Sequence, residues 1–343
     1  MDVFRKYFDE IIENNTIYVI GAGGWGTALS NLLAYNGYNV VLWAREPEIV
    51  SSINKYRVNN LFLPKIKLNE KVIAVNDLAV LKTQKFFVSA IPTQYIRKTF
   101  TASGINLNGK KVLNVAKGIE IDTLKRGSEI FSQLGVSSED FAVLTGPSHA
   151  EEVGLFQPTT VVTSSEDISY SRFIQILFSN DNFRVYTSQD IVGCELGGSI
   201  KNVIAIAAGI IDGLQFGDNT KAALITRGLA EMSRLSVAMG ANALTITGLS
   251  GLGDLIVTCN SKHSRNRKVG ELIGLGKKLN EIINEMQMIA EGVETTKSAY
   301  NLAQKHKVEM PIVTKVHQIL FDNLPPEVAL KDLMTREYRH ELG

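Results

Sequence analysis

Residues 21–26 read GAGGWG, a spacing that fits the pattern GxGxxG. Such glycines allow a tight turn between a strand and a helix and let the backbone approach a pyrophosphate closely. The context supports this interpretation, because the apolar run TIYVI precedes the motif and a helix-like stretch follows it, ending at Gly37. We therefore expect Gly21, Gly23 and Gly26 to bind a dinucleotide; the alternative is a glycine turn without a ligand.

A second apolar run, NVVLW, ends about twenty residues after the motif, where a dinucleotide site contacts the adenosine ribose. Arg45 stands there in place of the acidic residue that favours NAD(H). A guanidinium cannot accept a hydrogen bond from the ribose 2′-OH, but it can bind a 2′-phosphate. The sequence therefore predicts NADP(H) as the preferred cofactor, with NAD(H) as the second choice. Glu46 complicates this preference, and a solvated loop arginine is the alternative.

Candidate reactive groups follow other apolar runs, at the strand ends where open parallel sheets bind ligands. VLNVAKG brings Lys117 to one strand end, and FAVLTGPSHAEE brings Gly146, Ser148 and His149 to another. Small residues at such a turn expose backbone N–H groups to an anion or a carbonyl. Lys117 is equally compatible with a solvated position. His149 is a candidate general acid or base, but nothing in the sequence pairs it with a carboxylate.

Lys201 is the only charged residue between positions 196 and 211, in LGGSIKNVIAIAAGII, which is typical of a buried helix. A buried lysine must be paired or its pKa falls, and either condition suits a proton donor. Gly197 and Gly198 leave room for a substrate beside it. Asp254 stands alone among small and apolar residues, and its carboxylate could hold the Lys201 ammonium. A lysine that extends to the surface is the alternative.

A basic stretch, SKHSRNRK, combines an arginine with hydroxyl and amide donors. Its central residues are Ser264, Arg265 and Asn266, and its flanking cations are Lys262, Arg267 and Lys268. Donors of this kind at a helix start can bind a phosphate. We therefore predict a phosphate site here, with a solvated basic loop as the alternative.

The pattern of apolar residues changes along the chain and predicts two domains and a short N-terminal extension. Between residues 16 and 190, apolar runs alternate with helix-like stretches; the runs are TIYVI, NVVLW, KFFVSAI, KKVLNVA, FAVLT, TTVVT and FRVYT. Runs that are apolar throughout are typical of buried parallel strands, so we predict a Rossmann-like doubly wound α/β sheet. Residues 191–343 contain helical patterns only and predict an all-α domain, and residues 1–15 predict an amphipathic helical extension.

Composition excludes several classes of protein. The formal net charge of +1 over 343 residues gives no field that would attract nucleic acid or anionic lipid. Cys194 and Cys259 lack metal-knuckle spacing, so we expect two buried thiols, no metal and a reducing compartment. The N-terminus does not resemble a signal peptide, and no apolar run reaches the roughly 18 residues of a membrane span. We expect a cytoplasmic protein; a homodimer is left open.

Together these blocks resemble the bacterial NAD(P)-dependent sn-glycerol-3-phosphate dehydrogenase family. The matching segments, in family order, are GAGGWGTAL, NVAKGIE, LTGPSHAEEV, PTTVV, ELGGSIKNVIAIAAGIIDGL, NTKAALITRGLAEM, GLGDLIVTC, HSRN and EGVETTK. The resemblance implies reversible reduction of dihydroxyacetone phosphate to sn-glycerol 3-phosphate, which supplies glycerophospholipid synthesis.

The resemblance also implies roles for individual residues. It gives proton transfer to Lys201. It places around the substrate Lys117, Gly146, Ser148, Asp254, Ser264, Arg265 and Asn266. It places at the cofactor Gly24, Trp25, Arg45, Lys117, Ala150, Arg265, Ile289 and Glu291.

Some features depart from the family pattern, and two other functions stay open. Gly24 stands where serine is frequent, Glu46 stands where a second basic residue is common, and the segment before Thr16 lies outside the core pattern. A related two-domain dehydrogenase acting on a hydroxy acid is one alternative, but a carboxylate substrate would not need the phosphate site. The other is a module that senses NADPH without turnover, which would not need Lys201 and Asp254.

Overall fold

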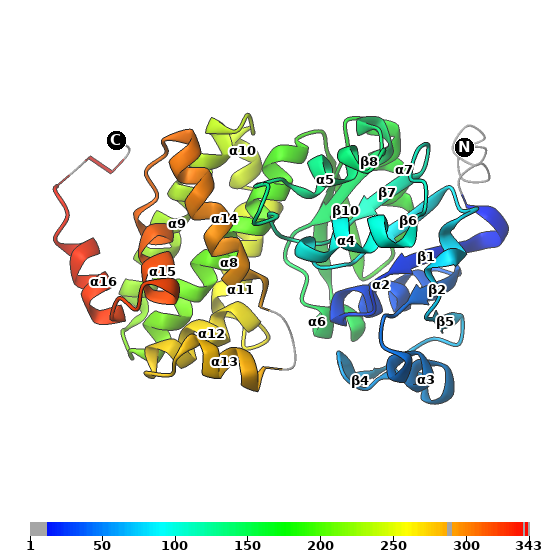
Figure 1. The fold of residues 1–343 in the computed structure, drawn as a ribbon, viewed down its shortest axis with the longest axis horizontal. Coiled ribbons are helices and arrows are strands. Elements are labelled where there is room, and N and C mark those ends of the chain that lie inside the picture. The colour runs from blue at the N-terminus through cyan, green and yellow to red at the C-terminus, as the bar shows by residue number, and fades with distance from the viewer. Residues whose placement is uncertain (1–11, 287–289, 339, 342–343) are drawn as a thin grey trace.

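The computed structural model describes residues 12–286, 290–338 and 340–341. It contains two halves, one built on a β-sheet and one built from helices (Figure 1). Within these residues, every strand lies before the helix that starts at Ile191. The predicted doubly wound α/β fold and the helical C-terminal half are both confirmed.

An eight-stranded sheet forms the centre of the first half, in the order β10-β9-β8-β7-β6-β1-β2-β5. Its strands are β1 Thr16–Ile20, β2 Asn39–Trp43, β5 Val72–Val75, β6 Phe86–Ser89, β7 Lys111–Asn114, β8 Phe141–Thr145, β9 Thr159–Ser164 and β10 Phe183–Ser188. All residues of β6 and β8 are buried, which is why those segments are apolar on both faces. Every apolar run that predicted a strand forms one.

One edge of the sheet differs from the parallel arrangement that was predicted. β8 pairs with β9 in the antiparallel direction, and β10 runs parallel to β9. The connection between β8 and β9 contains only α6 (Ala150–Gly154), a helix of 5 residues. Such a helix is about 7.5 Å long. It is too short to return the chain along β8, as a parallel crossover requires.

Sequence reasoning missed a small hairpin beside the glycine turn. Its strands are β3 (Val58–Asn59) and β4 (Leu63–Lys67), and β4 was missed because its apolar residues alternate with lysine and proline. Asn59 Nδ2 donates hydrogen bonds to the Ala22 carbonyl and to Thr27 Oγ1, each 2.8 Å long. The hairpin therefore stabilises the glycine turn that follows β1 through these hydrogen bonds.

Helices cover both faces of the sheet. They are α2 Gly24–Tyr35, α3 Pro47–Tyr56, α4 Thr93–Ser103, α5 Gly127–Gln133, α6 and α7 Ile168–Phe178, with 3₁₀ turns at Glu13–Asn15, Leu78–Leu81 and Ser138–Asp140. Leu29 of α2 and Phe173 of α7 belong to one apolar core, and Phe100 of α4 and Phe131 of α5 belong to a second. The helices thus bury the two sides of the sheet in separate cores.

The second half is arranged around one buried helix. Its helices are α8 Ile191–Gly213, α9 Asp218–Ala238, α10 Ala243–Ile246, a π-helical segment Leu249–Gly253, α11 Asp254–Asn260, α12 Arg265–Gly274, α13 Leu279–Glu285, α14 Glu291–His306, α15 Pro311–Phe321 and α16 Pro326–Met334. Side chains of α8 are buried nearly all round, as predicted. α12 crosses α8 closely, since a Cβ on Gly270 would lie 1.9 Å from the Ile206 carbonyl oxygen.

The apolar character of α8 is explained by this position. Among the described residues, two segments are long and apolar enough to match a membrane-spanning helix, Ile191–Gly213 and Ala243–Asn260. The first is wholly buried inside the protein and is its core helix.

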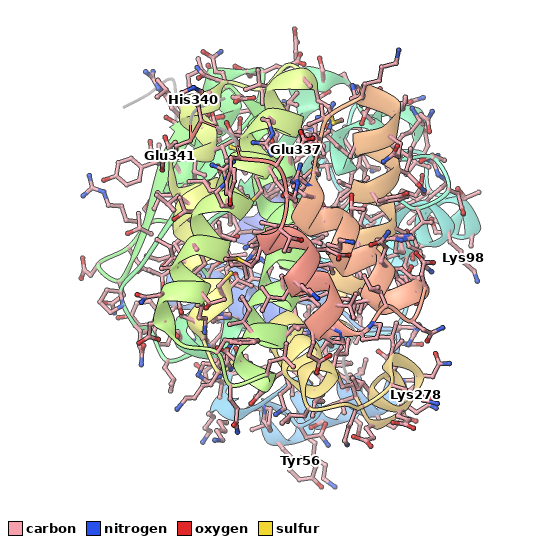
Figure 2. All side chains as sticks on the ribbon, turned by 90° about the vertical axis from the view of Figure 1, so that its left-hand side faces the viewer. Tyr56, Lys98, Lys278, Glu337, His340 and Glu341 are labelled. Atoms are coloured by element: carbon pink, nitrogen blue, oxygen red, sulfur yellow. The ribbon has the colours of Figure 1, made fainter. Side chains whose placement is uncertain are left out.

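The two ends of the described chain lie on different halves. Residues 1–11, which include most of the predicted N-terminal helix, lie outside the described residues. At the other end, Arg227 donates a hydrogen bond to the Glu341 carbonyl (3.0 Å), and Arg336 pairs with Glu309. Figure 2 shows this face of the helical half, where the C-terminal segment lies against α9.

Candidate active site

The glycine turn has the backbone geometry of a dinucleotide site. Gly21 has a φ of +118°, a conformation that other residues rarely adopt. A Cβ on Gly26 would lie 1.9 Å from the Gly21 carbonyl oxygen, so α2 can start here only without a side chain. A Cβ on Gly23 would have no neighbour within 4 Å. The turn is therefore open to a pyrophosphate at the N-terminus of α2, and its residues fit that group.

Gly24 has a structural reason to lack the serine side chain that is frequent in the family. A Cβ at this position would lie 3.0 Å from the Phe62 carbonyl oxygen of the hairpin, which is closer than an ordinary contact. Serine would require the Phe62 carbonyl to shift by a few tenths of an ångström.

Arg45 follows β2 and lies on the surface. Its side chain is 76% exposed and pairs with its neighbour, with 2.6 Å between Arg45 Nη2 and Glu46 Oε1. Glu46 also accepts a hydrogen bond from Arg45 Nε. The guanidinium predicted to bind a 2′-phosphate is thus already engaged by a carboxylate.

Lys201 and Asp254 meet inside the helical half. Lys201 Nζ lies 2.5 Å from Asp254 Oδ1 and donates a second hydrogen bond to Thr258 Oγ1 at 2.6 Å. Only 6% of the Lys201 side chain and 1% of the Asp254 side chain are exposed. Asp254 therefore does hold the Lys201 ammonium, and the lysine does not extend to the surface.

Lys117 reaches the same carboxylate from the sheet. Its Nζ lies 2.8 Å from Asp254 Oδ2 and also donates to the Gly146 carbonyl at 2.9 Å. Ser148 Oγ lies 3.4 Å away and itself donates to the Gly146 carbonyl. Asp254 thus uses its two oxygens to bridge two ammonium groups that come from different halves of the chain.

The charge state of this cluster follows from burial and from its members. Burial lowers the pKa of Lys201 to about 8; Asp254 opposes this effect and Lys117 adds to it. Burial alone would raise the pKa of Asp254, but the ammonium groups of Lys117 and Lys201 outweigh it and lower that pKa. Asp254 is therefore ionised at neutral pH, while Lys201 can gain or lose a proton slightly above it.

The predicted phosphate residues form the start of α12. Ser264 is the N-cap and accepts a hydrogen bond from the Arg267 backbone N–H. Asn266 Nδ2 donates to Asn202 Oδ1, and Asn266 Oδ1 accepts from the Gly292 backbone N–H, each at 2.9 Å. The Asn266 amide therefore links α8, α12 and α14 as well as facing the cleft.

The cations that flank these residues in the sequence do not line the cleft with them. Arg267 Nε lies 2.6 Å from Asp212 Oδ2, and Lys268 pairs with Glu271. Lys262 does not line the cleft either. The basic stretch is therefore divided between one cleft-lining arginine and structural or surface charges.

One cleft of about 210 Å³ between the two halves collects most of the predicted residues. The predicted residues that line it are Gly23, Gly24, Trp25, Gly26, Lys117, Ser148, Ala150, Lys201, Ser264, Arg265, Asn266 and Glu291. Asp254 and Gly146 do not line it but contact its lysines. Arg45 and Gly21 also lie outside its lining, and Ile289 lies outside the described residues.

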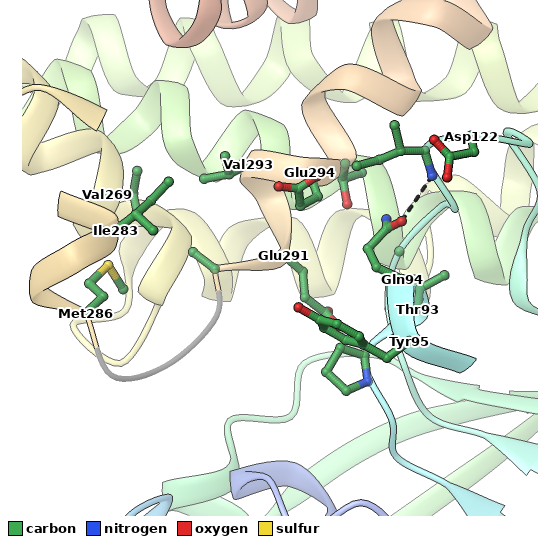
Figure 3. A pocket seen from close by; sticks show the side chains of 15 residues that line it. Thr93, Gln94, Tyr95, Asp122, Val269, Ile283, Met286, Glu291, Val293 and Glu294 are labelled. Atoms are coloured by element: carbon green, nitrogen blue, oxygen red, sulfur yellow. Dashed lines mark hydrogen bonds between the residues drawn. The ribbon is translucent and has the colours of Figure 1, made fainter. Parts of the chain in front are cut away.

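A second cleft of about 500 Å³ adjoins the first and shares Pro92 and Glu291 with it. Figure 3 shows Tyr95 of α4 on one side of it and Ile283 and Met286 on the other.

Glu291 lines both clefts. Burial raises the pKa of Glu291, and Arg265 acts in the opposite direction. Among the described residues, no group of three or more ligating side chains could hold a metal ion.

Sequence reasoning missed two polar residues of the site. Thr258 accepts from Lys201 and donates to the Asp254 carbonyl at 2.6 Å. Asn202 donates to the Lys117 carbonyl at 3.4 Å. A signal for Thr258 was its position one helical turn after Asp254, which places both side chains on one face of α11.

A glycine turn on a Rossmann-like sheet, facing a buried lysine–carboxylate pair on a helical domain, defines a two-domain nicotinamide-dependent dehydrogenase. Residues 16–171 match the N-terminal domain of NAD-dependent glycerol-3-phosphate dehydrogenase, and residues 190–331 match its C-terminal domain. The chain belongs to this family.

Individual relatives agree with the family match. The chain is 50% identical over 331 residues to glycerol-3-phosphate dehydrogenase [NAD(P)+] of Bacillus licheniformis, covering 95% of this chain and 96% of the relative. It is 51% identical over 330 residues to the enzyme of the same name from Citrifermentans bemidjiense, covering 95% and 98%. The crystal structure of glycerol-3-phosphate dehydrogenase from Coxiella burnetii superposes with a TM-score of 0.87 at 37% identity, covering 94% and 99%.

The chain is accordingly an oxidoreductase that uses NAD(P) to interconvert dihydroxyacetone phosphate and sn-glycerol 3-phosphate. This reaction supplies the backbone of glycerophospholipids.

Proposed function

We propose that Lys201 is the proton donor in dihydroxyacetone phosphate reduction and the proton acceptor in the reverse direction. The observation that carries this proposal is the bridge from Asp254 to Lys201 and Lys117 beside the cleft. The bound nicotinamide supplies or accepts the hydride. As negative charge develops on the substrate carbonyl oxygen, a cation within hydrogen-bond reach stabilises the transition state more than the ground state. Lys201 then gives its proton to that oxygen, and Asp254 retains the neutral amine in place.

Lys117, Gly146, Ser148, Ser264, Arg265 and Asn266 are proposed as substrate-binding residues. Arg265 is the cleft-lining arginine, and its guanidinium suits a bidentate contact with a phosphate. It stands at the start of α12, a helix of 10 residues whose N-terminus also favours an anion. The Lys117 ammonium lines the same cleft and adds a second positive charge.

For the cofactor, we propose NADPH as the preferred reductant, with a preference weakened by Glu46. A 2′-phosphate would pair with the Arg45 guanidinium, but it must compete with the carboxylate 2.6 Å away. NADH has no 2′-phosphate, so its binding does not depend on separating Arg45 from Glu46. The glycine turn, Trp25, Ala150, Arg265 and Glu291 are proposed to contact the rest of the dinucleotide.

We further propose that residues 16–190 form the dinucleotide-binding domain and residues 191–343 the substrate-binding and catalytic domain, each contributing residues to the other's ligand, in a cytoplasmic homodimer. The change from the sheet to α8 after β10 supports this division. Gel filtration with light scattering measures the oligomeric state.

A spectrophotometric assay of NADPH oxidation tests the proposed function. Dihydroxyacetone phosphate should be reduced, whereas ketopantoate and other 2-keto acids should react far more slowly because they lack a phosphate for Arg265. Faster reduction of a keto acid would favour the hydroxy-acid dehydrogenase, and NADPH binding without any turnover would favour a sensor.

A further inference from the structure

His149 is a cleft residue with an unsatisfied polar atom. It lies between Ser148 and Ala150 and lines the same cleft as Lys117 and Lys201. Its Nε2 atom is buried and has no hydrogen-bond partner among the described residues. A buried polar nitrogen without a partner destabilises a protein, because it has lost its hydrogen bonds to water and gained none in return. Such an atom in a ligand site is a group that a bound molecule can satisfy.

The surroundings of His149 keep its ring neutral. Burial, together with the nearby charges of Lys201 and Lys117, lowers its pKa to about 4, whereas Glu151 and Asp254 act in the opposite direction. His263 is the ring next to it, with 6.0 Å between the ring centroids. At neutral pH the imidazole therefore has one N–H donor and one acceptor nitrogen. It is a poor general acid but a suitable partner for a hydroxyl group, which can both donate and accept.

Dihydroxyacetone phosphate has three polar parts, and the proposed function accounts for two of them. Lys201 serves the C2 carbonyl and Arg265 serves the phosphate, and none of the proposed contacts is assigned to the C1 hydroxyl. We infer that His149 hydrogen-bonds the C1 hydroxyl and so makes the enzyme selective for a hydroxymethyl ketone over a methyl ketone. This inference rests on the proposed placement of the carbonyl and the phosphate. His149 acts as a specificity residue, separate from proton transfer.

The test compares dihydroxyacetone phosphate with hydroxyacetone phosphate, the methyl ketone that lacks only the C1 hydroxyl. The wild-type enzyme should have a kcat/KM about tenfold higher for dihydroxyacetone phosphate, the factor expected for one lost hydrogen bond in a buried site. His149→Phe retains a ring of similar size but removes both nitrogens, so it should bring the two values close to parity. His149→Gln, which keeps a donor and an acceptor, should restore part of the discrimination. His306→Phe is the matched control, because His306 lies in the last turn of α14 outside the cleft.

Several results would overturn the inference. Equal kcat/KM values for the two ketone phosphates in the wild-type enzyme would overturn it, and this measurement does not depend on whether the variants fold. An unchanged ratio in His149→Phe, with both substrates slowed equally, would assign the ring to packing or to the cofactor, and a raised KM for NADPH would identify the cofactor. Lys201→Met and Arg265→Ala should slow both ketone phosphates alike. Failure of that expectation would contradict the proposed function, whereas failure of the His149 ratio alone would contradict only this inference.

Discussion

The Lys201 ammonium and the Asp254 carboxylate lie 2.5 Å apart in the interior of the protein, and the second oxygen of Asp254 holds Lys117. The nearby Lys117 ammonium lowers the affinity of Lys201 for a proton, and the carboxylate between them opposes this effect. Burial and these charges together bring the pKa of Lys201 to about 8. The protonation state of Lys201 therefore depends on both charged neighbours, and it determines whether Lys201 can donate or accept a proton.

The pH dependence of both reaction directions follows from the protonation state of Lys201. Reduction requires protonated Lys201, so kcat/KM for dihydroxyacetone phosphate, which reports the free enzyme, should fall as the pH rises beyond about 8. Oxidation of glycerol 3-phosphate requires the neutral amine, so its rate should rise through the same pH. Asp254→Asn removes the anion that favours the charged lysine, so the fall in reduction should move to lower pH.

Steady-state pH profiles in both directions check this expectation. Asp212→Asn serves as the control, because Asp212 pairs with Lys221 and Arg267 outside the cleft. A shift of the Asp254→Asn profile to higher pH would contradict the assigned role of the carboxylate.

Substitutions of Arg45 and of Glu46, the neighbouring residues after β2, should change the selectivity for NADPH over NADH in opposite directions. Arg45→Ala should raise KM for NADPH about tenfold and change KM for NADH little, because only NADPH has a 2′-phosphate. Glu46→Gln should lower KM for NADPH by releasing the guanidinium. Arg184→Ala, on the opposite edge of the sheet, should leave both constants unchanged. Equal effects of Arg45→Ala on the two cofactors would show that Arg45 does not contact the phosphate.

Recognition of the substrate phosphate should depend on Arg265. Arg265→Ala should lower kcat/KM for dihydroxyacetone phosphate about 100-fold, the upper range for a lost hydrogen bond to a charged group. Unphosphorylated dihydroxyacetone should be affected much less. Arg267→Ala is a matched control, since this arginine pairs with Asp212 and does not line the cleft. An equal loss with both substrates in Arg265→Ala would refute the phosphate contact.

Glu231 predicts a pH dependence of stability that is independent of catalysis. It accepts hydrogen bonds from the backbone N–H groups of Ile312 and Val313 at the start of α15. Burial raises its pKa from 4.5 to about 7, against the effect of these hydrogen bonds. The folded protein therefore binds more protons than the unfolded chain between these pH values. The free energy of unfolding should fall as the pH rises from 4.5 to 7, by up to about 3 kcal/mol.

Glu231→Gln should remove most of that pH dependence, because an amide oxygen can still accept a hydrogen bond but does not titrate. Thermal unfolding across this pH range measures the effect. Glu70→Gln, at an exposed position, should leave the wild-type curve unchanged. A Glu231→Gln variant with the full wild-type pH dependence would show that this carboxyl is not its source.

The sequence predicts those features that depend on local pattern. The glycine turn needs residues without side chains at fixed positions, and an isolated charge such as Lys201 in an apolar helix must find a partner. The sequence does not predict features that depend on tertiary packing. The direction of β9 follows from the short α6, and Arg267 turns away from the cleft because Asp212 lies across from it. The contact of Thr258 with the Lys201 ammonium likewise depends on how α8 packs against α11, although its spacing from Asp254 is visible in the sequence.

Proton donation by Lys201 is tested most directly by single-turnover reduction of dihydroxyacetone phosphate with the Lys201→Met variant. Methionine keeps most of the apolar stem but has no proton to donate, and NADPH binding, followed by fluorescence, should survive. Lys221→Met is the matched control, because Lys221 pairs with Asp212 outside the cleft. The account predicts that the rate of the chemical step falls by roughly two to four orders of magnitude in Lys201→Met only. A folded Lys201→Met enzyme that reduces dihydroxyacetone phosphate at a near wild-type rate would contradict it.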